Sequence, residues 1–174
     1  MYHSVRTFHR WVGITAALFL VVIAGSGFLL ATKDSFSWVK PPTREGSPIE
    51  DLGELVSIQL ATEAAFAAGL ADLQSTSDID RVDYRPAQNV YKIRSRRGYH
   101  EVQVCGKTGE VLQVAQRNDQ LVEDIHDMSY FAEILHTYWL PAVSVLLFSM
   151  AITGVTIFTV PIVRRIRFRR KYKG

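Results

Sequence analysis

Two long apolar runs constrain this chain of 174 residues more than any other feature of its sequence. Residues 11–31 contain no charged side chain, and residues 134–163 contain no Asp, Glu, Lys or Arg. About 20 apolar residues in a helix, rising roughly 1.5 Å each, cross a hydrocarbon core of about 30 Å. The sequence therefore predicts two transmembrane helices, over residues 9–32 and 136–163, and excludes a purely soluble protein.

Charged residues are distributed unevenly around these runs. Two arginines precede the first run and seven Lys or Arg residues follow the second, whereas all 17 acidic residues lie between the runs. The two ends therefore carry +9 and the middle −6, which sums to the net charge of +3. Because cytoplasmic flanks hold the excess of Lys and Arg, we expect both termini in the cytoplasm and the middle segment outside it. We interpret the basic tail, residues 164–174, as an orientation signal beside anionic membrane lipid, and expect no nucleic-acid partner.

The segment between the runs has the pattern of a small α+β domain. Residues 33–55 contain several prolines and predict a stiff, extended linker. Residues 57–69 have apolar positions at helical spacing, with Ser57 as the N-cap. Four strand-like stretches follow, over residues 79–84, 90–94, 101–105 and 110–114. Period-two alternation in the middle two predicts an antiparallel sheet with one buried face, covered by one helix.

Three further features of the middle segment lead to structural predictions. Residues 117–135 predict an amphipathic helix along the outer membrane interface. The single cysteine, Cys105, cannot form an internal disulfide and is interpreted as a passive strand residue. Arg94, Arg96 and Arg97 predict a solvated strand edge, with docking of an anionic partner as the alternative.

Several motifs occur together along the chain. The first run opens with FHRWVG, from Phe8 to Gly13, and the second closes with Thr153-Gly154. Between them, residues 56–114 combine a helix with strands and a GKTG turn, although Cys105 stands before that turn where an Asp is common. In these motifs the chain resembles the PepSY-associated transmembrane proteins. The resemblance implies an extracytoplasmic PepSY-like domain over residues 56–116, in a protein of the bacterial cytoplasmic (inner) membrane.

The resemblance also carries expectations about cofactor and assembly. Larger members of the family look like haem-containing ferric-siderophore reductases, which implies haem b as a cofactor. Longer members have additional spans, whereas this chain has two apolar runs. A function that needs four helices therefore requires a second copy, as a homodimer, or another membrane subunit.

His9, at the start of the first apolar run, and His136, at the start of the second, are at positions suited to haem ligation. Ionisable residues near membrane depth are functional candidates, and neutral imidazole is a common ligand of haem iron. Gly27 follows His9 by 18 residues and Gly154 follows His136 by 18, which is five helical turns and returns to the same face. In an antiparallel pair, His9 then lies level with Gly154 and His136 level with Gly27, and each glycine leaves a gap for a flat macrocycle. Gly13 belongs to the same stripe of small residues, which also suits helix packing without a cofactor.

His126 is a third candidate ligand of haem iron. It precedes His136 by ten residues, or about 280° around a continuous helix, so one helix cannot direct both at a single iron. Its role stays open between ligation of a second iron, pairing with a histidine of another copy, and no role in the chemistry. His3 and His100 are expected to be surface residues.

These patterns support two functional hypotheses. The first is a b-type cytochrome that carries electrons across the membrane to an extracytoplasmic acceptor, such as a ferric chelate or a flavoprotein, as a component of a transmembrane reductase. Because no dinucleotide-binding motif occurs in the sequence, the donor would be a quinol or another protein. The second is a non-redox, membrane-tethered PepSY module that acts on a protease or another envelope partner. A tether needs one featureless helix, so two runs with glycines and histidines favour the cytochrome.

Overall fold

The computed structural model describes residues 2–172, and within them all side chains except those of residues 133, 135, 136 and 172. The chain forms two compact units: a helical unit built from its two ends, residues 1–28 and 124–174, and a sheet unit built from residues 29–123. The helical unit contains two candidate membrane helices and the sheet unit a four-stranded antiparallel sheet. This architecture confirms the fold class predicted from the sequence.

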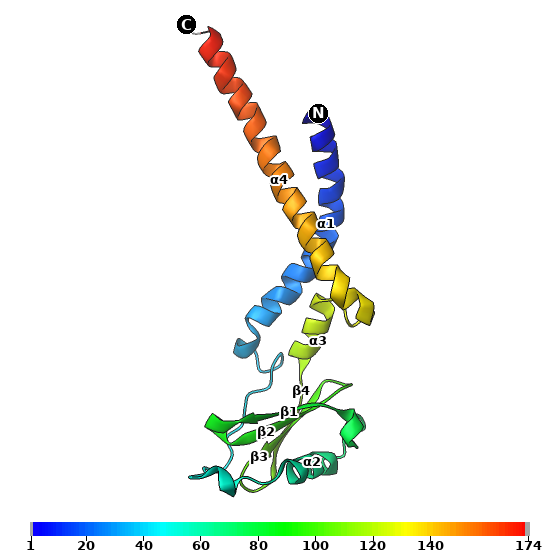
Figure 1. Ribbon diagram of the computed structural model, residues 1–174, viewed down its shortest axis with the longest axis vertical. Coiled ribbons are helices and arrows are strands. Elements are labelled where there is room, and N and C mark those ends of the chain that lie inside the picture. The colour runs from blue at the N-terminus through cyan, green and yellow to red at the C-terminus, as the bar shows by residue number, and fades with distance from the viewer. Residues whose placement is uncertain (1, 173–174) are drawn as a thin grey trace. The chain divides into compact units, whose positions relative to one another are not determined.

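The helical unit consists mainly of two long helices. α1 (Tyr2–Ala31) and α4 (Glu133–Tyr172) run antiparallel, so the two termini lie at the same end of the pair (Figure 1). Large apolar side chains such as Leu18 and Phe158 are exposed along both helices. An apolar surface of this extent indicates contact with lipid, and the length and hydropathy of both helices are those of membrane spans.

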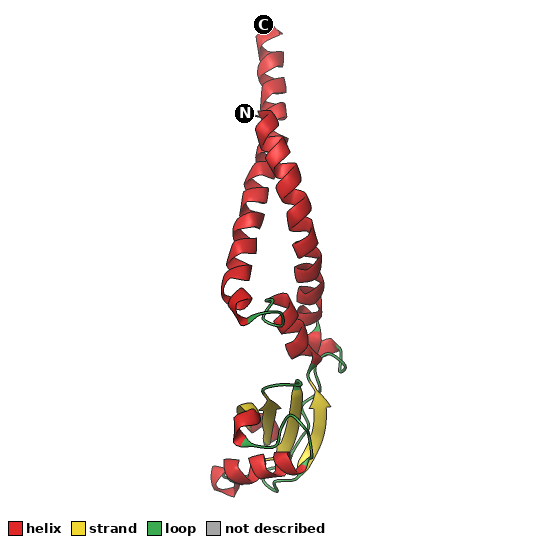
Figure 2. Cartoon of the chain, turned by 90° about the vertical axis from the view of Figure 1, so that its right-hand side faces the viewer, coloured by secondary structure: helices red, strands yellow, loops and turns green. Residues whose placement is uncertain are grey.

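The sheet unit is built from consecutive antiparallel hairpins. Its strand order is β1 (Ile79–Arg85), β2 (Val90–Ser95), β3 (His100–Cys105) and β4 (Val111–Gln116). α2 (Ile58–Ala67) lies across one face of this sheet (Figure 2), and the Ser57 hydroxyl accepts a hydrogen bond from the Leu60 N–H at 3.2 Å, as the predicted N-cap. The core under α2 comprises Ala61, Ala65, Leu73, Tyr91, Ile93, Val102 and Val104. Short 3₁₀ helices lie at Lys33–Ser35, Leu52–Glu54, Thr76–Asp78 and Pro86–Gln88.

The opposite face of the sheet is also covered, and the prediction of a single buried face is wrong. Residues 38–48, here called the strap, run along this face: they begin in a turn at residues 38–39 and continue without helix or strand from residue 41. The Arg44 N–H donates to Gln103 Oε1 at 2.7 Å, and Gln103 Nε2 donates to the Pro42 carbonyl at 3.0 Å. Under this cover Lys92 and Glu101 are only 3% and 1% exposed. The alternation of polar residues therefore reflects a polar interior and not a solvated face, and this part of the expected linker is bound to the domain.

The predicted helix over residues 117–135 is interrupted in the structure. α3 (Asn118–His126) ends at His126, and Met128 adopts a φ of 66° before α4 begins. A right-handed helix cannot continue through a residue with positive φ. The apolar residues on either side of Met128 therefore do not form one continuous helical stripe.

Candidate functional site

His9 lies against α4 near the N-terminal end of α1. Its Nδ1 is 2.8 Å from Thr153 Oγ1. A Cβ added at Gly154 would lie 3.4 Å from His9 Cε1, so the imidazole ring contacts the backbone of α4 at this glycine. The predicted match in level between His9 and Gly154 is confirmed.

His126 occupies the corresponding place near the other end of α1. Its Nδ1 is 2.8 Å from Ser26 Oγ, and a Cβ added at Gly27 would lie 3.5 Å from its Cε1. His126 therefore faces the glycine that the sequence pattern matched with His136. The side chain of His136 lies outside the described residues.

The two contacts repeat one arrangement. In each, a histidine packs on a dipeptide of a hydroxyl residue and a glycine in the facing helix, Thr153-Gly154 for His9 and Ser26-Gly27 for His126. Sequence reasoning identified the glycines but missed Ser26 and Thr153, although the repeated hydroxyl-Gly dipeptide was visible. The imidazole itself fills the space beside each glycine. The absence of a side chain at the glycine therefore allows the histidine ring to pack closely on the facing helix.

The hydroxyl contacts bear on which nitrogen of each imidazole carries the proton. Thr153 Oγ1 donates to the Ser149 carbonyl at 2.8 Å, and Ser26 Oγ donates to the Val22 carbonyl at 2.6 Å. A hydroxyl has one proton, and a carbonyl can only accept. With the hydroxyl proton directed at that carbonyl, the hydroxyl oxygen is the acceptor and imidazole Nδ1–H is the donor. This tautomer leaves the lone pair on Nε2, the atom available to ligate a metal.

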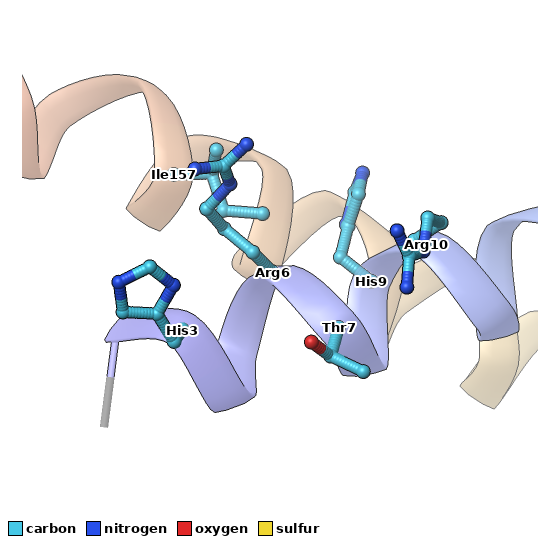
Figure 3. A pocket seen from close by; sticks show the side chains of 6 residues that line it. All are labelled: His3, Arg6, Thr7, His9, Arg10 and Ile157. Carbon is cyan, nitrogen blue, oxygen red and sulfur yellow. The ribbon is translucent and has the colours of Figure 1, made fainter.

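A pocket of about 380 Å³ adjoins His9 in the helical unit. Arg6 and His9 point toward α4, whereas Thr7 points away from it (Figure 3). The residues that line the pocket are His3, Arg6, Thr7, His9, Arg10 and Ile157. Two guanidinium groups beside an imidazole suit a ligand that carries carboxylates, because a guanidinium donates in a fork that matches carboxylate oxygens.

Between the two histidines, the helices pack through small and apolar side chains. A Cβ added at Gly13 would approach Met150 Cε to 2.9 Å, so this glycine permits a close contact between helices. Phe19 and Trp139 pack edge to face with their ring centroids 4.6 Å apart. In the structure Gly13 is therefore a helix-packing residue, while its expected place beside a cofactor stays a prediction.

The two histidines form separate sites. Gly27, which faces His126, follows His9 by 18 residues in the continuous helix α1, which places the two histidine levels about 27 Å apart along the axis. Among the described residues, no group of three or more His, Cys, Asp or Glu side chains is arranged to hold a metal ion. Of the described histidines in the helical unit, His3 and His9 line one pocket, and His126 lies near the other end of α1. A haem held by two imidazoles at the His126 end would need a second histidine.

The remaining sequence candidates lie in the sheet unit. His100 is paired with Asp72, whose Oδ1 is 2.9 Å from His100 Nδ1. Cys105 is buried, and its Sγ accepts a hydrogen bond from the Ser47 N–H of the strap at 3.3 Å. Burial raises the pKa of this thiol, but hydrogen bonds led by those of Thr108 outweigh burial and lower the pKa to about 7. These contacts tie Cys105 into the packing under the strap.

Comparison with known proteins identifies the family. The model of a protein family described as "PepSY-associated TM region" matches residues 6–174. This range includes nearly all of α1, the sheet unit and α4. No curated protein matches the sequence. The match covers nearly the whole chain and agrees with an architecture of two membrane helices around a small α+β domain, and the protein therefore belongs to the PepSY-associated transmembrane family.

Proposed function

We propose that this protein is a b-type cytochrome-like electron-transfer protein of the membrane. The observation that supports this proposal is the repeated hydroxyl-histidine contact. With each hydroxyl donating to its backbone carbonyl, Nδ1–H is the donor to the hydroxyl, and Nε2 of both His9 and His126 carries a lone pair. An axial haem ligand must supply that lone pair. Histidines that ligate metals commonly donate their other ring N–H to a neighbouring acceptor, which orients the ring.

The residues of the helical unit divide into ligands and positioning groups. His9 and His126 would hold haem b at opposite ends of the helix pair, and Thr153 and Ser26 would orient their rings. Haem, when bound, supplies reversible one-electron chemistry. At the His9 end, Arg6 and its neighbour Arg10 would pair with the propionate carboxylates, because both line the pocket beside this imidazole.

A homodimer would complete both sites. Two helices cannot enclose a macrocycle, whereas a bundle of four can direct side chains from facing helices to one cofactor. A two-fold axis along the membrane normal would bring each histidine near its copy. The exposed apolar surfaces of α1 and α4 leave room for such a contact. His136, or another membrane subunit, is the alternative source of the second ligand at the His126 end.

The charge distribution supports an orientation of the proposed electron path across the membrane. With both termini in the cytoplasm, the His9 end would face the cytoplasm and the His126 end the outside. Electrons from a quinol or a cytoplasmic protein would then reach an extracytoplasmic ferric chelate or flavoprotein, in the bacterial inner membrane. The non-redox alternative, a PepSY module acting on a protease, does not account for two hydroxyl-oriented histidines.

The test is the haem content of the purified full-length protein, supplied with haem during expression. We expect a Soret band, with sharpened visible bands on reduction by dithionite. His9→Ala and His126→Ala should each remove about half of the haem. The control His100→Ala, in the sheet unit, should keep it, and His136→Ala separates a shared ligand from a bystander. A protein that takes up no haem, or full haem in both ligand variants with unchanged reduced spectra, would contradict the proposal.

The proposed orientation has its own test. Lys173→Cys places a thiol in the basic tail, while the buried Cys105 contributes little background. An impermeant thiol reagent should label this cysteine in opened cells and not in intact ones. Labelling in intact cells would place the tail outside and contradict the proposed orientation.

A further inference from the structure

The sheet unit concentrates positive charge in one pocket. Residues 29–123 contain 11 Lys or Arg and 14 Asp or Glu, so this unit is net negative. A pocket of about 350 Å³ in the same unit is nevertheless lined by six cationic side chains and only two carboxylates, those of Asp83 and Glu123. The six cations are Lys33, Lys40, Arg81, Arg85, Arg94 and Arg117. More than half of the unit's cations thus converge on one cavity.

The floor of this pocket is a largely buried group of ions around Glu101. Arg94 Nε and Arg117 Nη1 lie 3.4 and 3.5 Å from the same oxygen, Glu101 Oε2. Lys92 Nζ lies 3.2 Å from the other oxygen of Glu101, and Asp119 pairs with Arg117. Arg94 Nη2 also lies 3.2 Å from Asp83 Oδ2, so the three cations meet three carboxylates, of which Glu101 and Asp119 are fully buried. Arg94 Nε is buried and makes no hydrogen bond within the described residues.

The rim of the pocket carries cations that are weakly neutralised. Neither Lys33 nor Arg85 forms an ion pair with a described carboxylate. The other two rim cations contact exposed carboxylates, Lys40 with Asp34 and Arg81 with Asp80. Exposed ion pairs contribute little free energy, so an arriving anion can compete for these side chains.

The chemistry of the cations favours a phosphate group over a single carboxylate. Arginines donate through planar forks that pair with two oxygens at once, and a phosphate offers three or four oxygens in different directions to several forks and ammonium groups. Lys33 follows the last residue of α1, Ala31, by two positions. Covalent connectivity therefore holds Lys33 within about 8 Å of the end of a membrane helix.

We propose that this pocket binds a phosphate group, carried by an anionic phospholipid headgroup or by a soluble phosphate compound. Buried Arg94 and Arg117 form the floor, and Lys33 and Arg85 close over the anion from the rim. The proposal does not depend on haem, because every residue that carries it lies in the sheet unit.

The test measures binding to the full chain in a neutral detergent by calorimetry. One arm titrates inorganic phosphate, and the other titrates short-chain phosphatidylglycerol, with short-chain phosphatidylcholine as the zwitterionic reference. The variant Lys33→Gln/Arg85→Gln removes two rim charges without touching the buried floor. Arg96→Gln/Arg97→Gln removes two exposed charges from the same unit outside this pocket and is the matched control. Unchanged circular dichroism and thermal unfolding establish that both variants fold.

We expect binding in at least one arm, weakened tenfold or more in the rim variant and unchanged in the control. Binding of inorganic phosphate identifies a soluble ligand, and binding of phosphatidylglycerol alone identifies a lipid headgroup. Absence of binding in both arms overturns the proposal. Equal binding of phosphatidylcholine and phosphatidylglycerol, or equal affinity in the rim and control variants, also overturns it.

Discussion

The helical unit and the sheet unit differ in how their polar side chains are paired. In the helical unit, the contacts of His9 with Thr153 and of His126 with Ser26 are hydrogen bonds between groups that can be neutral. In the sheet unit, the polar interior is ionic and centred on Glu101. Charge is costly at membrane depth, whereas a water-exposed domain can bury ions when each one is paired. The difference shows that the sheet unit holds its own interior together, while the helical unit relies on lipid around it.

The largest effect should come from breaking the ionic interior. Glu101→Gln keeps the size of the side chain but removes the charge shared by Lys92, Arg94 and Arg117. Breaking a buried ion pair from one side costs about 3–5 kcal/mol. Amide hydrogen exchange of β2 and β3 in the detergent-solubilised protein should show this loss of protection. Glu110→Gln in the exposed hairpin turn is the control, and a loss below about 1 kcal/mol in Glu101→Gln would mean that the cations are neutralised in another way.

A Leu→Ala substitution should have different effects on stability in the two units. Leu73 is fully buried in the sheet unit, whereas Leu18 is 71% exposed on α1. Leu73→Ala should lower the free energy of unfolding of the sheet unit by about 2–5 kcal/mol, because it leaves a cavity. Leu18→Ala should change stability by less than about 0.5 kcal/mol, because it creates no cavity. Denaturant unfolding followed by circular dichroism measures both, and equal losses would show that Leu18 packs against a partner such as a second copy.

Removing a hydroxyl from the helical unit should have a smaller effect on stability. Thr153→Val keeps the shape of the side chain but deletes the acceptor of His9 Nδ1–H, and interhelical hydrogen bonds in membranes average about 0.6 kcal/mol. If His9 ligates haem, the variant should also weaken haem affinity by about 10–100-fold. Thr156→Val is the matched control, because the Thr156 hydroxyl donates to Ile152 of its own helix. Haem titration measures the difference, and equal affinity in both variants would deny Thr153 a positioning role.

The smallest effect on stability is expected from an exposed ion pair, Lys107 with Glu54. It contrasts with the buried ion pairs of Glu101. A hydrogen bond from Lys107, with others from the Glu50 and Asp51 N–H groups, lowers the pKa of Glu54 from 4.5 to about 2. Because the folded-state pKa is depressed, this group stabilises the fold above about pH 4.5, and the contribution is lost as the pH falls toward 2. Lys107→Met should return the pKa of Glu54 toward 4.5 in a side-chain carboxyl NMR titration. An unchanged pKa would assign the shift to the backbone donors.

Features with a regular period could be predicted from the sequence, and features that depend on irregular backbone could not. The spans, the strands and the match of His9 with Gly154 follow from periodicities that continue without interruption. The strap has no period, and its contacts join residues far apart, such as Arg44 and Gln103. The match of Gly27 with His126 depends on the turn at Met128, whose positive φ redirects the chain. The equal spacings that matched Gly27 with His136 carry no information about His126, which precedes this turn.

The strap also determines where the chain enters and leaves the sheet unit. The Asp119 N–H donates to the Val39 carbonyl at 2.7 Å, and Asn118 Nδ2 donates to the Trp38 carbonyl at 2.8 Å. The incoming and outgoing segments are therefore hydrogen-bonded neighbours. A domain whose two ends are adjacent behaves as an insertion in a loop and can be exchanged for another without changing the spacing of its attachment points. The protein is in this sense a pair of membrane helices with a domain inserted in the connection between them, and another domain with adjacent ends could be grafted at the same two points.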